Sequence, residues 1–312
     1  MGEKKSLRDS YGKTLVELGR IHDDIVVLDA DLAKSTKTEL FKKEFPSRFF
    51  DMGISEADMI GTATGFASAG FKPFCSSFAM FLTGRVFDQI RNSIAYPHWN
   101  VKLVSTHAGI SVGEDGASHQ CIEDLALMRA VPGMAILCPS DAYMTADLTK
   151  KLYDYQSYAY MRLPRNELEI LYKENDSFDI GKSATIKKGA DITIIACGAM
   201  VSIAKNTLLR FQSMGIDAGL LDMYSIKPLD KQALLDALNT SKAILVAEEH
   251  SVIGGLSSAV AEFAALNRPV LMEFVGIEDT FGESGTPESL FEKYNLTEEA
   301  ILKKGKMLYD KF

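Results

Sequence analysis

The chain has 312 residues, of which 46% are hydrophobic and 24% are charged, and its formal net charge is −8. This length allows about two domains, and the acidic balance gives the chain no overall attraction for nucleic acid. A phosphate-bearing ligand would therefore have to be held by a local group of cationic side chains. The sequence has no apolar run of membrane-spanning length, and its first residues lack the apolar core of a signal peptide. We expect a cytoplasmic protein that binds neither membranes nor nucleic acid.

The first half of the chain alternates predicted helices with apolar strands. Helical spacing of apolar residues predicts a first helix over residues 6–20. A continuous apolar run predicts a buried strand over 25–32, and further strands are predicted over 48–53, 72–78, 101–106, 134–139 and 159–163. Further helices are expected over 37–44, from 55, and over 79–96, 122–131 and 141–155, the last of them capped by Ser140. This alternation predicts a doubly wound, mostly parallel α/β sheet.

Residues 164–180 lose the alternation, and it resumes after them. Strands are predicted over 191–198, 217–223, 242–250 and 269–276, with helices between them and two more at the end. We therefore divide the chain into a domain over 1–170, a linker over 171–180 and a smaller α/β domain over 181–312.

Polar residues follow the predicted strands of the first domain, at the edge where open parallel sheets bind ligands. They are Asp31, Glu56, His107, Asp115, His119 and Arg165. Glu56 admits two interpretations. It is either a catalytic acid or only a helix-start residue, with Ser55 as the N-cap and Asp58 completing a capping box.

The other candidate stretches also have structural explanations. The glycine-rich loop over 107–120 fits either a small-ligand loop or a solvated surface loop. Its His and acidic residues match no metal-binding spacing, so no metal ligands are predicted here. Phe78 and Phe81 have the spacing of core residues. Glu248, Glu249 and His250 end a strand of the second domain, where packing or an interface is the expected explanation.

Taken together, several motifs resemble the second half of transketolase. They are DADLAKS (29–35), RFFDMGISEADM (48–59), SSFAMF (76–81) followed by FDQIR (87–91), STHAGISVGEDGASHQ (105–120) and YSIKPLD (224–230). The resemblance covers nearly the whole chain. It implies a thiamine-diphosphate pyrimidine-binding domain followed by a transketolase C-terminal domain.

The resemblance also implies roles for individual residues. Glu56 would hydrogen-bond the aminopyrimidine of thiamine diphosphate and activate it. Phe78 would stack on the pyrimidine, Phe81 would line its pocket, and Asp31 would lie near the thiazolium or the neighbouring loop. His107 and Asp115 would bind sugar hydroxyls, and His119 would contact the substrate near its reacting carbonyl. The groups expected at the sugar phosphate are Arg8, Ser35 and Arg165.

The sequence departs from the family pattern at two places. Gly84 replaces a third pocket aromatic, and the diphosphate-and-metal motif, GDG followed by a distant Asn, does not occur. The chain thus resembles the C-terminal subunit of a split transketolase. An N-terminal subunit would then bind most of the diphosphate and Mg²⁺, and the two subunits would associate as an α2β2 heterotetramer acting on sugar phosphates.

Three alternatives stay open. In deoxyxylulose-phosphate synthase, the loop typically carries Asp-Arg where His107 and Ala108 stand and GADG in place of GEDG, so the loop favours transketolase. A 2-oxoacid dehydrogenase β subunit has no reason to keep the sugar loop. A non-catalytic scaffold of the same fold has no reason to retain Glu56, Asp115 and His119 together.

Overall fold

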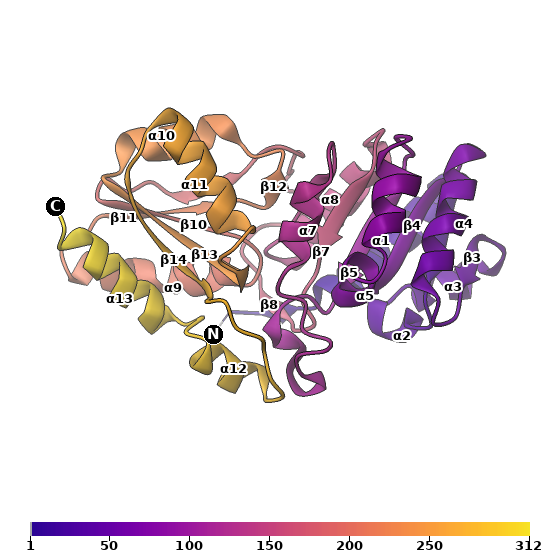
Figure 1. Ribbon diagram of the computed structural model, residues 1–312, viewed down its shortest axis with the longest axis horizontal. Coiled ribbons are helices and arrows are strands. Elements are labelled where there is room, and N and C mark those ends of the chain that lie inside the picture. The colour runs from indigo at the N-terminus through magenta and orange to yellow at the C-terminus, as the bar shows by residue number, and fades with distance from the viewer. Residues whose placement is uncertain (1) are drawn as a thin grey trace.

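The larger sheet of the computed structural model, which describes residues 2–312, has seven strands in the order β12-β6-β7-β5-β4-β2-β3 (Figure 1). These strands are β2 (Ile25–Asp29), β3 (Phe49–Asp51), β4 (Lys72–Phe78), β5 (Lys102–Thr106), β6 (Ala135–Leu137), β7 (Ala159–Arg162) and β12 (Ser225–Lys227). Neighbouring strands are parallel except β12, which pairs antiparallel with β6.

Helices cover both faces of this sheet because successive strand residues point to opposite sides. Ile25 and Val27 pack in one cluster with α1 and α8, whereas Val26 and Leu28 pack with α4 and the segment after it in another. The helices are α1 (Leu7–Ile21), α2 (Ala33–Thr36), α3 (Glu39–Glu44), η1 (Pro46–Arg48), α4 (Glu56–Ser68), α5 (Ala79–Thr83), α6 (Phe87–Gln89), η2 (Ile90–Ala95), η3 (Ile110–Asp115), α7 (Asp124–Ala130) and α8 (Ala142–Asp154).

The smaller sheet has five strands in the order β14-β13-β10-β11-β9, all parallel except β9. Its elements are β9 (Ala184–Lys187), β10 (Ile192–Ala196), α9 (Met200–Ser213), β11 (Ala218–Asp222), α10 (Lys231–Thr240), β13 (Ala243–Ser251), α11 (Leu256–Asn267), β14 (Leu271–Ile277), α12 (Pro287–Lys293) and α13 (Glu298–Tyr309). The predicted α/β fold, with a mostly parallel sheet and a smaller second unit, is confirmed.

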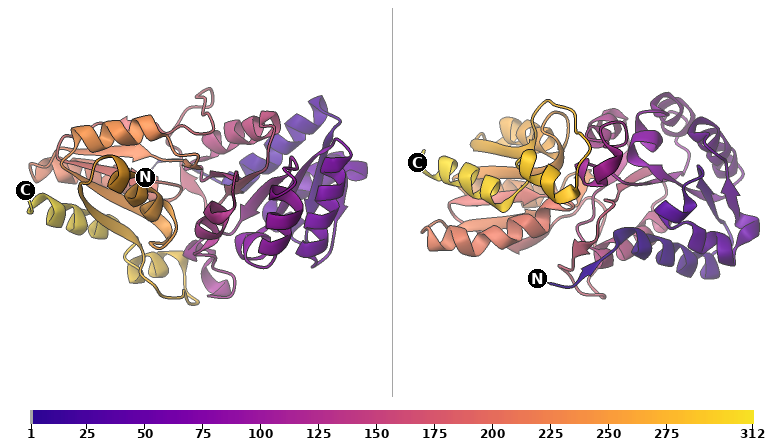
Figure 2. Two further views of the ribbon diagram at one scale, coloured as in Figure 1. Left: turned by 45° about the horizontal axis from the view of Figure 1, so that its top comes forward. Right: turned by 90° about the horizontal axis from the view of Figure 1, so that it is seen from below.

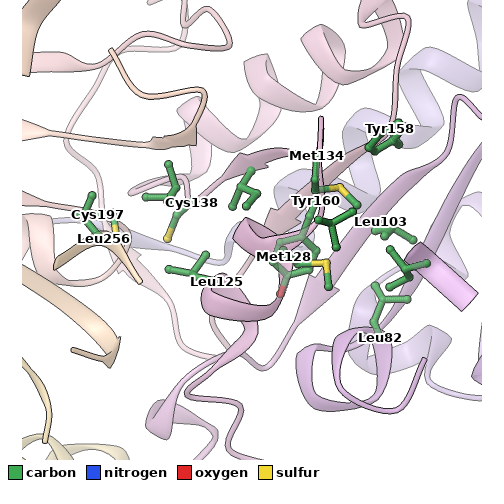
Figure 3. Close-up of a cluster of buried hydrophobic side chains, with 14 of the residues drawn as sticks. Leu82, Leu103, Leu125, Met128, Met134, Cys138, Tyr158, Tyr160, Cys197 and Leu256 are labelled. Carbon is green, nitrogen blue, oxygen red and sulfur yellow. The ribbon is translucent and has the colours of Figure 1, made fainter. Parts of the chain in front are cut away.

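The two sheets lie side by side along the long axis (Figure 2) and share one apolar core. Figure 3 shows this core running from Leu82 and Leu103 of the first half to Cys197 and Leu256 of the second. Strand β12 follows residue 181 in the chain yet completes the edge of the larger sheet. The division at 1–170, 171–180 and 181–312 stays a prediction.

Local structure differs from expectation at three places. The single helix predicted over 79–96 is broken: α5 ends at Thr83, just before Gly84, and a π-helical turn follows α6. Asp141, not Ser140, caps α8, because its carboxylate accepts the Met144 N–H at 2.8 Å. A two-stranded ribbon that the pattern did not reveal joins β1 (Lys4–Lys5) to β8 (Leu168–Glu169). Within residues 2–312, the helices are too short or too polar to cross a membrane.

Candidate active site

Glu56 is the first residue of α4, and its side chain is only 2% exposed. Arg85 Nη1 donates to Glu56 Oε2 at 2.9 Å, while Ser77 Oγ lies 3.5 Å from Oε1. Ser55 precedes the helix but its side chain makes no capping hydrogen bond, so the predicted capping box is absent. The carboxylate is thus buried toward the end of β4. A group that displaced Arg85 or approached Oε1 could hydrogen-bond to it.

A continuous row of rings extends from this carboxylate along the end of the larger sheet. The Arg85 guanidinium lies over the Phe81 ring, 4.2 Å from its centroid. Phe81 makes an edge contact with His119 at 5.2 Å between centroids and lies 6.0 Å from Phe78. Phe78 stacks on His107 at 3.8 Å. The two phenylalanines, whose spacing suggested core packing, therefore line the site, and Phe81 is only partly buried.

His107 is held in an uncommon conformation immediately after β5. Its φ of 57° lies in the left-handed region, and its Nδ1 is 2.8 Å from Thr106 Oγ1. Burial, together with the positive charges of Arg8 and Arg165, lowers the pKa of His107 to about 3. The imidazole is therefore neutral near pH 7, so it can both donate and accept hydrogen bonds.

The three residues expected at a sugar phosphate lie together. Arg8 donates from Nη1 to the carbonyl of Ser35 and from Nη2 to the carbonyl of Arg165, both at 2.7 Å. Arg165 in turn donates to the carbonyl of Val112 and to Glu114 Oε2, the latter at 3.1 Å. Arg8 Nε is buried and has no partner within residues 2–312. This unpaired donor, on a guanidinium group that also contacts the backbone of Arg165, favours an anionic ligand.

Asp31 and Asp115 lie at the periphery, with exposed side chains. Asp31 follows β2 with a φ of 62°, and its backbone N–H donates to Asp51 Oδ1 at 3.1 Å. Within residues 2–312, the structure joins neither aspartate to the aromatic row by a hydrogen bond or ion pair.

Arg85 is the residue that the sequence analysis missed. It follows Gly84, where a pocket aromatic was expected, and it lies four residues after Phe81 in the chain. Its guanidinium covers the partly exposed ring of Phe81 and pairs with the buried carboxylate of Glu56. The available signal was a cation one helical turn from a candidate pocket aromatic.

Comparison with known proteins shows the family to which the chain belongs. The family model for the transketolase pyrimidine binding domain matches residues 3–170, and that for the transketolase C-terminal domain matches residues 181–301. A protein of Methanocaldococcus jannaschii named as a transketolase C-terminal section is 45% identical over 308 residues, covering 97% of this chain and 96% of its own length. The 6-deoxy-6-sulfo-D-fructose transketolase subunit SqwH of Clostridium sp. (strain MSTE9) is 38% identical over 301 residues, covering 96% and 94%.

A solved structure of a split-gene transketolase, an inactive β4 tetramer, superposes with a TM-score of 0.92. It shares 45% sequence identity with this chain, and the superposition covers 98% of both. The two family models together span most of the chain. They agree with the relatives, which are similar to this chain over nearly their full length. The chain belongs to the transketolase family.

Proposed function

We propose that this chain is the C-terminal subunit of a thiamine-diphosphate-dependent transketolase, which moves a two-carbon ketol unit from a ketose phosphate to an aldose phosphate. The observation that supports this proposal most strongly is that the candidate residues form one unbroken series of contacts. A buried carboxylate, two phenylalanine rings and both ends of the polar loop meet in one row of contacts. Family membership supports the reaction class, and the row supplies groups of the right chemistry.

The residues present fit the pyrimidine half of thiamine diphosphate. Glu56 is a buried carboxylate whose Oε1 has, among residues 2–312, only the 3.5 Å hydrogen bond from Ser77, so it can form a hydrogen bond with a ring nitrogen. Phe81 is partly exposed and Phe78 lies behind it, which suits stacking on a planar heterocycle. When bound, thiamine diphosphate supplies the carbon that accepts the ketol unit. Asp31 would lie toward its thiazolium side.

The polar groups around the aromatic row would bind the sugar. Neutral His107 can hydrogen-bond a hydroxyl group, and His119, at the edge of Phe81, would contact the substrate near its carbonyl. Asp115 would approach another hydroxyl from the exposed side of the loop. The anionic end would be held by Arg8, Ser35 and Arg165, where the unpaired Arg8 Nε offers a donor. The anionic group of the substrate would then lie at the arginines, and its reacting carbonyl would lie at the opposite end, near His119.

We infer that a partner subunit completes the site. Among residues 2–312, no group of three or more His, Cys, Asp or Glu side chains is placed to hold a metal ion. An N-terminal subunit would bind the diphosphate and Mg²⁺, and the pair would form an α2β2 heterotetramer. The inactive β4 tetramer of the similar split-gene transketolase supports this division of labour.

The identity of the anion is a separate question. The similar SqwH subunit is named for a sulfonated sugar, 6-deoxy-6-sulfo-D-fructose. Arg8 and Arg165 supply donors that suit a sulfonate as well as a phosphate. A split transketolase acting on sulfonated sugars is therefore the second candidate function.

Glu56→Gln tests the proposed chemistry in the reconstituted pair. The amide keeps the side-chain shape but cannot exchange a proton, so we expect ketol transfer to fall by a factor of about 10²–10⁴. Asp58→Asn is the matched control, because Asp58 lies on the first turn of the same helix with its side chain exposed. Activity of Glu56→Gln within a few-fold of the parent would overturn the proposal.

A further inference from the structure

The polar loop over residues 107–120 belongs to the first half of the chain but is held by the second. Ile110 is fully buried in the apolar cluster of the smaller sheet, together with Ile194 and Val275. Gln120 Nε2 donates to the carbonyl of Glu283 at 2.9 Å, outside the loop. Helix α12 lies against η3, below the junction of the two sheets in Figure 1. The loop conformation therefore depends on packing from the second sheet.

Glu249 makes the central polar contact between the two halves. It lies on β13 with 2% of its side chain exposed, and its Oε1 accepts the backbone N–H of Ser111 at 2.8 Å. Gly109, with a φ of 81°, passes so close that a Cβ there would overlap Glu249 Oε1. The close approach of glycine backbone to a buried carboxylate leaves the loop little freedom at this point.

The backbone that carries Glu249 is itself fixed. Arg162 Nη2 donates to the carbonyl of Glu249 at 2.7 Å, and Arg162 Nε donates to Asp124 Oδ2 at 2.8 Å. Arg162 is the last residue of β7 in the larger sheet, so this bond ties the two sheets together at the same place. Glu249 thus links the polar loop to a rigid buried network.

We propose that Glu249 is a positioning residue for substrate binding. By holding the Ser111 N–H it fixes the loop whose two ends carry His107 and His119, and so the second domain sets the affinity of the site for sugar. This inference rests on the proposed function. Glu249 does not touch the aromatic row, and it acts only through the loop backbone.

The experiment compares variants of Glu249 with variants of Glu248, its neighbour on the same strand. Glu249→Met keeps the side-chain length but removes the acceptor, whereas Glu249→Gln retains a carbonyl oxygen. Glu248 is equally buried, but its carboxylate accepts the N–H groups of Leu256 and Ser257, each at 2.7 Å, at the start of α11. Glu248→Met therefore disturbs a comparable buried carboxylate without touching the loop.

In the reconstituted pair we expect Glu249→Met to raise KM for the ketose phosphate about tenfold while kcat changes by less than about threefold. Glu249→Gln should restore KM to within about threefold of the parent, and Glu248→Met should leave KM within about twofold. If Glu249→Met does not fold, Gly109→Ala displaces the same contact from the loop side and should raise KM similarly. An unchanged KM, or equal changes in the Glu248 and Glu249 variants, would overturn the inference.

Hydrogen exchange of the peptide over residues 107–120 in the chain alone separates this inference from the proposed function. We expect exchange in Glu249→Met to be about tenfold faster than in the parent, with Glu248→Met unchanged. A parent pair without transferase activity would refute the proposed function, and the exchange result would still decide whether Glu249 holds the loop. Parent-like exchange in Glu249→Met would refute its positioning role.

Discussion

The ion pair between Arg85 and Glu56 should stabilise the folded chain, because the Glu56 carboxylate is buried. Arg85→Met keeps the length of the side chain but leaves the Glu56 carboxylate, which is 2% exposed, without its 2.9 Å partner. Removing one partner of a fully buried pair costs about 3–5 kcal/mol, whereas exposed pairs contribute about 0–1 kcal/mol. Because the Arg85 side chain is 47% exposed, we expect the free energy of unfolding to fall by about 1–3 kcal/mol.

A double-mutant cycle isolates the pair from the other contacts of Arg85. Arg85→Met removes the cation–π contact with Phe81 equally from the parent and from the Glu56→Gln variant, so this contact cancels in the cycle. We expect a coupling energy of about 1–2 kcal/mol. The assay is urea unfolding followed by the fluorescence of Trp99, the single tryptophan, which packs against the shared core. A coupling energy below about 0.3 kcal/mol would show that the ion pair does not stabilise the folded chain.

Three further predictions concern buried ionisable side chains. Arg162→Met should lower the free energy of unfolding by about 3–5 kcal/mol, because Asp124 is left charged and buried; adding Asp124→Asn should recover part of that loss, and no recovery would contradict the explanation. NMR shifts of the His107 imidazole should report the neutral form down to about pH 4, since its pKa is lowered to about 3; this group's contribution to stability is present above pH 6.5 and lost as the pH falls toward 3, and titration near pH 6.5 would contradict the buried geometry. Burial raises the pKa of Asp222 from 3.8 to about 7, so its contribution to stability falls as the pH rises through that range; Asp222→Asn should abolish this part of the pH dependence of urea unfolding, and an unchanged profile would contradict it.

Much of the fold followed from local sequence pattern. The strands at Ile25–Asp29, Lys72–Phe78 and Lys102–Thr106 are short runs in which apolar and small side chains predominate, and their alternation with helices predicts a parallel sheet. The antiparallel edge strand at Ser225–Lys227 could not be predicted in this way. It is three residues long and joins a sheet whose other strands precede it by more than sixty positions, so only tertiary contacts define it.

The candidate site shows a similar limit. Glu56, His107 and Arg165 could be selected because they follow predicted strands, and the structure places them at one edge. The pairing of Arg85 with Glu56 depends on the break in the chain after α5. The sequence pattern does not reveal this break, because it predicts one long helix there. The sequence pattern assigns Glu249 to packing or an interface, and its hydrogen bond with Ser111 joins residues 138 positions apart. Long-range contacts of single side chains leave no periodic signal.

Reconstitution with a partner subunit shows whether the active site is divided between two chains. The purified chain, supplied with thiamine diphosphate and Mg²⁺, is assayed for transfer of the two-carbon unit from a ketose phosphate to an aldose phosphate, alone and with an N-terminal transketolase subunit from the same source. A sulfonated ketose in a parallel assay separates the two candidate substrates. We expect transfer only when both subunits are present. Transfer by the chain alone, or none by the pair with either donor, would contradict this expectation.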